Sequence, residues 1–362
     1  MRLTISSNKI WALVVATFLF KLIYFFYYKI LITGTVFGGG NDADYYHFFA
    51  ISDYQFAVNF WPVILRYLNE IGLYNRDIIA TINFVLSLTL LPILYYKLVK
   101  IKTDEMTPVK AGSYFIIIFY PSIFYFTVDI YREILMFTIL LLSLLLYKKI
   151  FEVNFARRNI YFLIYIALAY FAYSLRVYLG FALGLTPFVY LFLSKTKKYF
   201  KVWLAIYFLI LILINFFGGI DVILDYRENF LISASRSGAT LGISLIDQNP
   251  IMFFFYYCLS IMGQLFGLYL VNLNAVLVFF LESLPFIFAC VYISKNIKFM
   301  TKFAVFLLTF FVIYSTIWLL GNDNLGTAVR LRIPSYLSIF ACMFIIYQTK
   351  IILAYEKLKK IN

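Results

Sequence analysis

The chain has 362 residues, of which 64% are hydrophobic and 13% are charged, and its formal net charge is +14. Soluble globular chains are about half apolar and about a quarter charged, so this composition excludes a water-soluble enzyme, a disordered chain and a secreted disulfide scaffold. The three cysteines lie in apolar runs without paired spacing, and the only histidine is His47. Neither a zinc site nor a histidine-rich metal cage is therefore indicated.

Long apolar runs recur along the whole chain, and a membrane span needs about 20 mostly apolar residues. We therefore expect an all-α, polytopic transmembrane helix bundle that forms a single integral-membrane domain over residues 1–362. No small-residue cleavage site follows the first run, so we interpret it as a retained helix rather than a signal peptide. The runs are 10–33, 78–99, 111–128, 133–147, 160–175, 177–194, 201–217, 251–272, 275–294, 303–320 and 335–354.

Clusters of Lys and Arg predict the orientation of these runs, because basic residues gather in cytoplasmic loops. The clusters at the N-terminus and after two, four and six crossings all fall on one side, which we interpret as the cytoplasm. The orientation of the chain in a membrane therefore explains its positive net charge. We expect it to bind a lipid bilayer and not nucleic acid.

The basic clusters at 295–302 and 350–360 reach the cytoplasm only if one of the two runs 251–272 and 275–294 does not cross. The run 251–272 follows Asn249-Pro250 and contains two glycines and a glutamine, which suits a bent segment. We predict that it is a re-entrant or interfacial hairpin on the outer side. About ten crossings remain, with both termini cytoplasmic.

The basic residues of the outer side are all arginines. The arginine side chain is a planar fork that binds phosphate with two hydrogen bonds, whereas lysine acts as a point charge. We therefore expect a phosphate or pyrophosphate ligand on this side, although a bias in composition would produce the same pattern. The residues are Arg66, Arg76, Arg132, Arg176, Arg227, Arg236, Arg330 and Arg332.

The first long outer loop, about 34–77, opens with three glycines and then presents Asp42, Asp44 and His47. One aspartate is expected to cap a helix that starts near Tyr45, but two acids and a histidine exceed what capping requires. The stretch that follows predicts one or two amphipathic helices in the membrane interface, with Pro62 as a break. A second long outer loop covers about 218–250 and extends to 272 with the hairpin.

Further charged groups stand between or inside apolar runs. Arg132 and Glu133 follow Asp129 between two runs, and we expect Glu133 to begin a helix. Arg132 and Glu133 either form a tight charged turn or serve a function, because placing charged side chains within the membrane is costly. Lys21 lies inside the first helix and needs either a partner, for which Glu282 is a candidate, or a water-filled cavity. Lys29 is expected to reach the outer headgroups.

Small and polar residues surround the remaining outer arginines. Arg236 lies in a segment rich in Gly and Ser, and Arg330 and Arg332 frame a predicted glycine-bearing turn, 321–334, before the final helix. Glycine-rich backbone beside arginine can cradle an anion. Arg176 stands alone between two apolar runs, where it either serves such a site or extends to the headgroups.

These residues resemble parts of a known family. The Asp-bearing first outer loop resembles that of multi-spanning glycosyltransferases of the C superfamily, which use polyprenyl-phosphate-linked sugars. The pattern Tyr120-Pro121-Ser122 to Arg132-Glu133 looks like their third and fourth helices. The stretch from Asn324 to Pro334 is similar to one before the last helix of bacterial polysaccharide polymerases. The Phe- and Tyr-rich build also resembles O-antigen polymerases, although the long arginine-to-glycine repeat of some of them is not found.

The resemblance implies a membrane glycosyltransferase on the outer side of a bacterial inner membrane, acting in O-antigen or surface polysaccharide assembly. Its donor and acceptor would be sugars or oligosaccharides linked to undecaprenyl phosphate or diphosphate, with a chain-length regulator or other assembly proteins as further partners. No cofactor is required, and a divalent metal on the acids is compatible with the chemistry. A transporter or flippase of lipid-linked oligosaccharide is the alternative, and a structural subunit of an export complex is a third.

Each candidate residue has a role in this chemistry. Asp44 is the expected base for the acceptor hydroxyl, with Asp42 as alternative or partner. Five arginines are expected to hold the departing phosphate, and three further residues are site candidates. The arginines are Arg132, Arg176, Arg236, Arg330 and Arg332, and the further candidates are His47, Glu133 and Lys29.

Overall fold

A computed structural model describes residues 7–31, 41–101, 107–193, 200–234, 240–246 and 249–359. Regular structure in these ranges is helical, apart from one isolated antiparallel bridge between Thr240 and Asn324. The predicted all-α class is therefore confirmed. The chain divides into two compact units, a first unit of Met1–Phe181 with Tyr347–Asn362 and a second unit of Ala182–Ile346. The predicted glycine turn at 38–40 and Arg236 lie outside the described residues.

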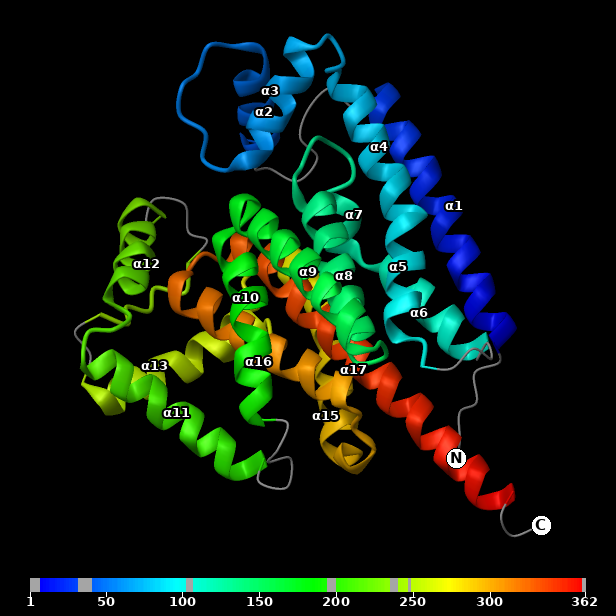
Figure 1. Ribbon diagram of the computed structural model, residues 1–362. Coiled ribbons are helices and arrows are strands. Elements are labelled where there is room, and N and C mark those ends of the chain that lie inside the picture. The colour runs from blue at the N-terminus through cyan, green and yellow to red at the C-terminus, as the bar shows by residue number, and fades with distance from the viewer. Residues whose placement is uncertain are drawn as a thin grey trace. The chain divides into compact units, whose positions relative to one another are not determined.

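The first unit contains a core in which α1 runs alongside α4, α5 and α6 (Figure 1). The Phe25 and Phe84 rings stack at 4.0 Å inside an apolar cluster that also contains Val14, Leu88 and Ile118. Its helices are α1 (Ser7–Leu31), α2 (Asn41–Ile51), α3 (Phe60–Glu70), α4 (Arg76–Leu88), α5 (Leu90–Val99), α6 (Thr107–Phe119), α7 (Pro121–Tyr125), α8 (Glu133–Ile150) and α9 (Phe155–Leu175). The start of α10 (Val177–Leu193) and the end of α17 (Leu325–Lys359) belong to it as well.

Two helices, α2 and α3, form the predicted outer loop region, and they pack on each other. The Arg66 guanidinium binds the carboxyl end of α2, where it donates to the carbonyl oxygens of Phe49 at 2.8 Å and Ser52 at 2.9 Å. The prediction that Pro62 breaks this region was wrong. Pro62 lies in the first turn of α3, where its missing N–H costs nothing, and the break falls between the two helices instead.

In the second unit, short helices, two of which meet at a sharp bend, pack around α16. In it α11 and α12 meet at a bend of 79°, so part of the loop predicted at 218–250 is helical. Two π-helical turns, Ile261–Leu265 (η2) and Phe279–Ser283 (η3), carry buried polar side chains, and such turns are frequent at functional sites. The helices are α11 (Phe200–Phe216), α12 (Asp221–Ala234), α13 (Pro250–Ser260), α14 (Leu273–Val278), α15 (Leu284–Lys295), the 3₁₀ turn η4 (Ile297–Phe299) and α16 (Lys302–Gly321).

Helix α17 begins earlier than the sequence suggested. The Asn324 side chain accepts the Thr327 backbone N–H at 2.9 Å, and the helix runs from Leu325 onward. The predicted turn 321–334 is therefore wrong over most of its length, because Arg330 and Arg332 lie on a helix. Polar and glycine residues suggested a loop, but the asparagine cap starts the helix within that stretch.

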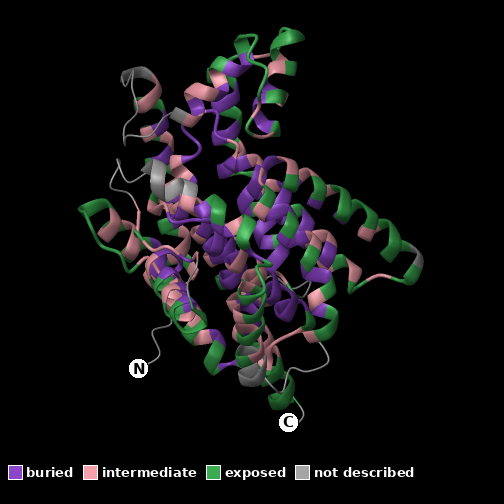
Figure 2. Ribbon diagram, turned by 90° about the vertical axis from the view of Figure 1, so that its left-hand side faces the viewer, coloured by how far each residue is buried: buried purple, intermediate pink, exposed green. Residues whose placement is uncertain are grey.

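Within the described residues, six helices are long and apolar enough to cross a membrane, or seven if the bent pair α11 and α12 forms one span. Large apolar side chains are exposed along α1, among them Phe20 and Ile23, and Figure 2 shows exposed and buried residues side by side on the same helices. Such surfaces are consistent with a multi-pass membrane protein, as predicted. The six spans are Ser7–Lys29, Arg76–Val99, Arg157–Leu175, Leu273–Lys295, Lys302–Gly321 and Leu325–Lys359.

A fully buried ion pair joins α12 to the turn before α17 in the second unit. The side chains of Arg227 and Asp323 are both 0% exposed, and their Nη2 and Oδ1 atoms are 2.5 Å apart. Arg227 also donates to the carbonyl oxygens of Leu319 at 2.8 Å and Asn322 at 2.7 Å. Asp323 accepts the Gly242 N–H at 2.9 Å, so every charge in this group is satisfied.

Removing one partner of this pair should destabilise the second unit strongly. Asp323→Ala leaves a buried guanidinium without its counter-ion, and such losses cost about 3–5 kcal/mol. We expect a clearly lower thermal unfolding midpoint for the purified protein in detergent. Asp77→Ala, at a side chain that is 78% exposed, is the control and should change the midpoint little. Equal midpoints for both variants would contradict this role.

Candidate functional site

One arginine of the first unit connects two aspartates that are distant in sequence. Arg76 Nη2 lies 2.8 Å from Asp44 Oδ1 and 2.7 Å from Asp129 Oδ2, and Arg76 Nε lies 2.9 Å from Asp129 Oδ1. Asp129 thus takes the two-pronged contact, and Asp44 takes a single one. The planar fork of arginine suits such bridging better than a lysine ammonium does.

Local structure fixes each member of this Arg76 cluster. Asp44 lies in the first turn of α2, and Arg76 is the first residue of α4 because the Asn75 side chain caps that helix. The segment after α7 is held by the Trp61 indole N–H, which donates to Ile130 O at 2.7 Å. Asn83 Nδ2 donates to Tyr131 O at 3.1 Å in the same segment. Asp129 is consequently held facing Arg76.

The Arg76 cluster is partly open to solvent. The side chains of Asp44, Arg76 and Asp129 are 46%, 30% and 15% exposed, respectively. A carboxylate that accepts a proton from a substrate must be reachable, and Asp44 is the most exposed of the three. Asp44 is therefore the most accessible carboxylate of the cluster, and Asp129 is the more covered one.

His47, the third predicted member of this loop, contacts Tyr74 rather than the aspartates. His47 Nδ1 and the Tyr74 hydroxyl are 2.8 Å apart, and the two rings stack at 5.8 Å. Burial raises the pKa of Tyr74 to about 12, so its hydroxyl remains protonated. The charges of Arg76 and Asp129 act on the same hydroxyl, which places this pair beside the Arg76 cluster.

A second group of predicted residues gathers where α8 begins and α9 ends. Arg132 Nη1 donates to Leu175 O at 2.9 Å, so its guanidinium lies at the junction where Arg176 follows α9. Glu133 is the first residue of α8, as predicted, and is only 1% exposed. Burial raises the pKa of Tyr46, and the charges of Arg132, Glu133 and Asp42 also act on it.

Lys29 pairs with an exposed acid and does not join the predicted site residues. Its Nζ lies 2.7 Å from Asp77 Oδ1 in an exposed ion pair at the end of α1. Exposed pairs of this kind contribute little stability. Lys21, the other lysine of α1, is buried, and its ammonium lies 4.7 Å from the centre of the Phe124 ring.

Arg332 of the second unit contacts an acid within the bundle. Its Nη2 lies 3.7 Å from Glu282 Oε2, and both side chains are nearly fully buried. The Tyr336 hydroxyl lies 3.0 Å from Ser283 Oγ and donates to Leu265 O at 2.6 Å. Arg332 is thus close to the two π-helical turns, whereas Arg330 is half-buried on α17.

The structure therefore brings some predicted residues together and adds others. Asp44 is joined by Arg76 and Asp129, which the sequence did not single out as site residues. Asp129 precedes the predicted pair Arg132 and Glu133 by only a few residues. This run of charged residues could have indicated Asp129 as a site residue. Arg227 was noted only as an outer basic residue, and its partner Asp323 was not predicted.

No group of three or more His, Cys, Asp or Glu side chains is placed to hold a metal ion in the described part of the chain. No protein-family model, no curated protein and no solved structure matches this chain. The physical arrangement of its side chains is therefore the basis for any functional conclusion.

The Arg76 cluster should behave as one energetic unit. In a double-mutant cycle of Arg76→Gln and Asp129→Asn we expect a coupling of about 1–2 kcal/mol, because the contact is two-pronged and partly buried. The control cycle, Lys29→Gln with Asp77→Asn, should give less than about 0.5 kcal/mol. Denaturant unfolding in detergent measures both, and an additive result for Arg76 and Asp129 would contradict the cluster.

Proposed function

We propose that this chain is a membrane glycosyltransferase that transfers or polymerises undecaprenyl-(di)phosphate-linked sugar units on the outer face of a bacterial inner membrane. The product would be O-antigen or another surface polysaccharide. The observation that supports this best is Asp44, a partly exposed carboxylate held by Arg76 at one end of a unit with apolar spans.

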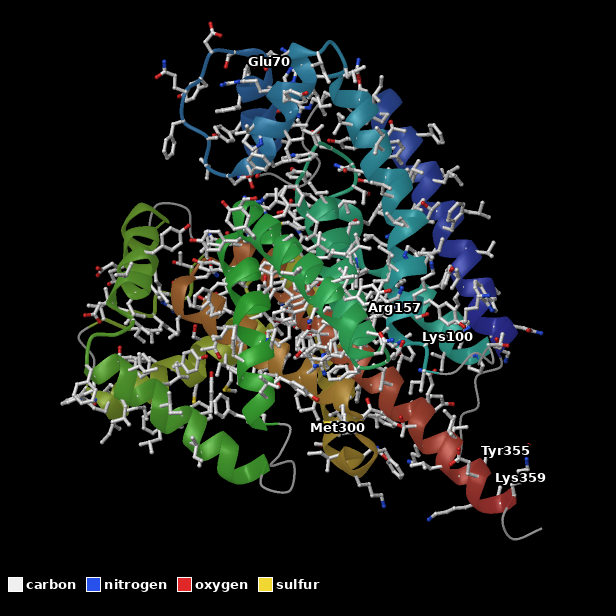
Figure 3. All side chains as sticks on the ribbon, in the orientation of Figure 1. Glu70, Lys100, Arg157, Met300, Tyr355 and Lys359 are labelled. Carbon is white, nitrogen blue, oxygen red and sulfur yellow. The ribbon has the colours of Figure 1, made fainter. Side chains whose placement is uncertain are left out.

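The position of Asp44 fits the outer side. Arg76 and Lys100 stand at opposite ends of the apolar segment Arg76–Val99. Trp11 near the start of α1 packs on Tyr114, which also packs on Tyr96 near the end of α5. Figure 3 shows Glu70 at one end of the first unit and Lys100, Arg157 and Lys359 toward the other. A cytoplasmic location of the lysine-rich end would place both termini inside and Asp44 outside.

The second unit supports the predicted hairpin. Thr240 pairs with Asn324, and Gln264 Nε2 donates to Asn322 O at 2.8 Å. The segment from 240 to 264 therefore leaves and returns to the same turn. This return supports a re-entrant segment at about 251–272. Lys298 lies before α16, whose 20 residues separate it from that turn.

The proposed reaction needs few groups. Asp44 accepts the proton of the acceptor hydroxyl. As the proton leaves, the oxygen of that hydroxyl bonds to the anomeric carbon of the donor sugar. The bond between that carbon and the phosphate oxygen breaks, and the lipid phosphate leaves with the electron pair. Cationic side chains stabilise the departing charge. In the first unit, which contains Asp44, the candidates for this role are Arg132 and Arg176, and no cofactor is needed.

Asp44→Asn tests the proposed base. The amide keeps the size of the side chain but cannot accept the proton, and losing a general base costs about a hundred- to ten-thousand-fold in rate. We expect normal accumulation in the membrane but no polymer, with single repeat units remaining on the lipid. Gel analysis of chain length measures this. Asp77→Asn, an exposed acid of the same unit, should leave chain length unchanged, and unchanged polymer in Asp44→Asn would exclude Asp44 as the base.

The topology is tested by single cysteines in a background without Cys258, Cys290 and Cys342. Residues 240 and 325 should react with a membrane-impermeant reagent added outside. Residue 298 should react only after the membrane is opened, because α16 separates it from 325. Labelling of 298 from outside would refute the re-entrant segment.

A transporter or flippase of lipid-linked oligosaccharide is the second candidate. The buried pair of Arg332 and Glu282 favours it, since ionisable groups inside spans mark many transport pathways. A leaflet-to-leaflet assay with fluorescent polyprenyl-linked sugar separates the two functions. A transporter moves the lipid without lengthening its glycan.

A further inference from the structure

Glu133 carries a buried carboxyl group that its own surroundings do not satisfy. The residue is 1% exposed, and neither Oε1 nor Oε2 has a hydrogen-bond partner among the described residues. It belongs to the first turn of α8, where the helix dipole favours an acid. That effect does not replace the hydrogen bonds that a buried carboxyl group loses.

A buried polar group without partners is costly in either protonation state. Native proteins satisfy nearly all such groups, and the exceptions call for a specific explanation such as an absent ligand. The cost disappears when a ligand donates hydrogen bonds to the two oxygens. A ligand that satisfies both oxygens of Glu133 needs at least two hydrogen-bond donors.

The neighbouring Arg132 has an unused donor of its own. Its Nη1 is engaged by Leu175 O, but its Nε is buried and lacks a hydrogen-bond partner in the described part of the chain. Tyr46 of α2 is 4% exposed, and its hydroxyl is within electrostatic range of both charges. The Asn59 side chain, which caps α3, hydrogen-bonds to the same hydroxyl. The Tyr46 hydroxyl is thus near a buried carboxyl group and a buried guanidinium, and each of those two groups has unsatisfied hydrogen-bonding atoms.

We propose that Glu133, Arg132 and Tyr46 form a subsite for a neutral sugar ring of the lipid-linked substrate. Two neighbouring sugar hydroxyls donate to the Glu133 carboxylate, and Arg132 Nε donates to a sugar oxygen. The inference rests on the proposed function and adds to it the group that recognises the glycan. It also gives Arg132 a role with the sugar instead of the phosphate role expected from the sequence.

The mixed charges of the subsite exclude other ligand classes. A phosphate would meet the carboxylate of Glu133, and like charges in close contact repel. A free organic cation would meet the guanidinium of Arg132 in the same way. A metal ion needs several oxygen or nitrogen ligands, and no cluster of three suitable acids, histidines or cysteines exists in the ranges that the structure covers. A neutral polyol offers both donors and acceptors, so it matches both side chains.

The subsite is tested by ligand-dependent thermal unfolding of the full chain in nanodiscs. The probes are a panel of neutral methyl hexosides and methyl 6-deoxyhexosides, with inorganic pyrophosphate for comparison. At least one glycoside should raise the unfolding midpoint of the wild type, of Asp44→Asn and of Glu70→Gln, an exposed acid of the same unit. In Glu133→Gln the apparent Kd for that glycoside should be about 10- to 100-fold weaker, because charge-assisted hydrogen bonds are lost. Arg132→Lys should weaken it as well.

Several outcomes would overturn the subsite. One is the absence of any glycoside effect on the wild type, and another is an equal response of Glu133→Gln. Stabilisation by pyrophosphate alone, lost in Arg132→Lys, would identify an anion site. Glycoside binding by a wild type that makes no polymer would refute the proposed transfer reaction and leave the subsite standing.

Discussion

The contact of the Arg76 guanidinium with two carboxylates determines how the end of the first unit that carries α2 and α3 is built. It joins the start of α4 to the first turn of α2 and to the segment before α8. Without this cation, Asp44 and Asp129 would repel each other across a small apolar unit. The same contact sets the position of Asp44, so the proposed base and the local fold depend on one interaction.

The same constraint acts at two buried ion pairs of the second unit. Arg227 with Asp323, and Arg332 with Glu282, bring opposite charges together at buried positions of the second unit. Burying a charge is affordable only with a counter-charge or several hydrogen bonds. Glu133 departs from that pattern within the described residues, and this departure is why it points to a ligand.

Much of the fold followed from local sequence, whereas the site did not. Hydropathy located α1, the segment Arg76–Val99 and α16, and the Asn249-Pro250 pair correctly marked the start of α13. Ion-pair partners are not local, since Arg76 lies 32 residues from Asp44 and Arg227 lies 96 residues from Asp323. A single sequence gives no measure of such distances. The early start of α17 was missed because one cap, Asn324, outweighed a polar stretch that is typical of a turn.

We propose that this chain catalyses glycosyl transfer rather than moving its substrate. The most direct measurement uses purified protein in nanodiscs, incubated with extracted lipid-linked repeat units and analysed for glycan chain length. Nanodiscs contain no separate compartments, so transport alone produces no change there. The account predicts a ladder of lengthened glycans on the lipid, with release of polyprenyl phosphate or diphosphate. Unchanged single repeat units, together with movement of the same lipid between leaflets of liposomes, would contradict it.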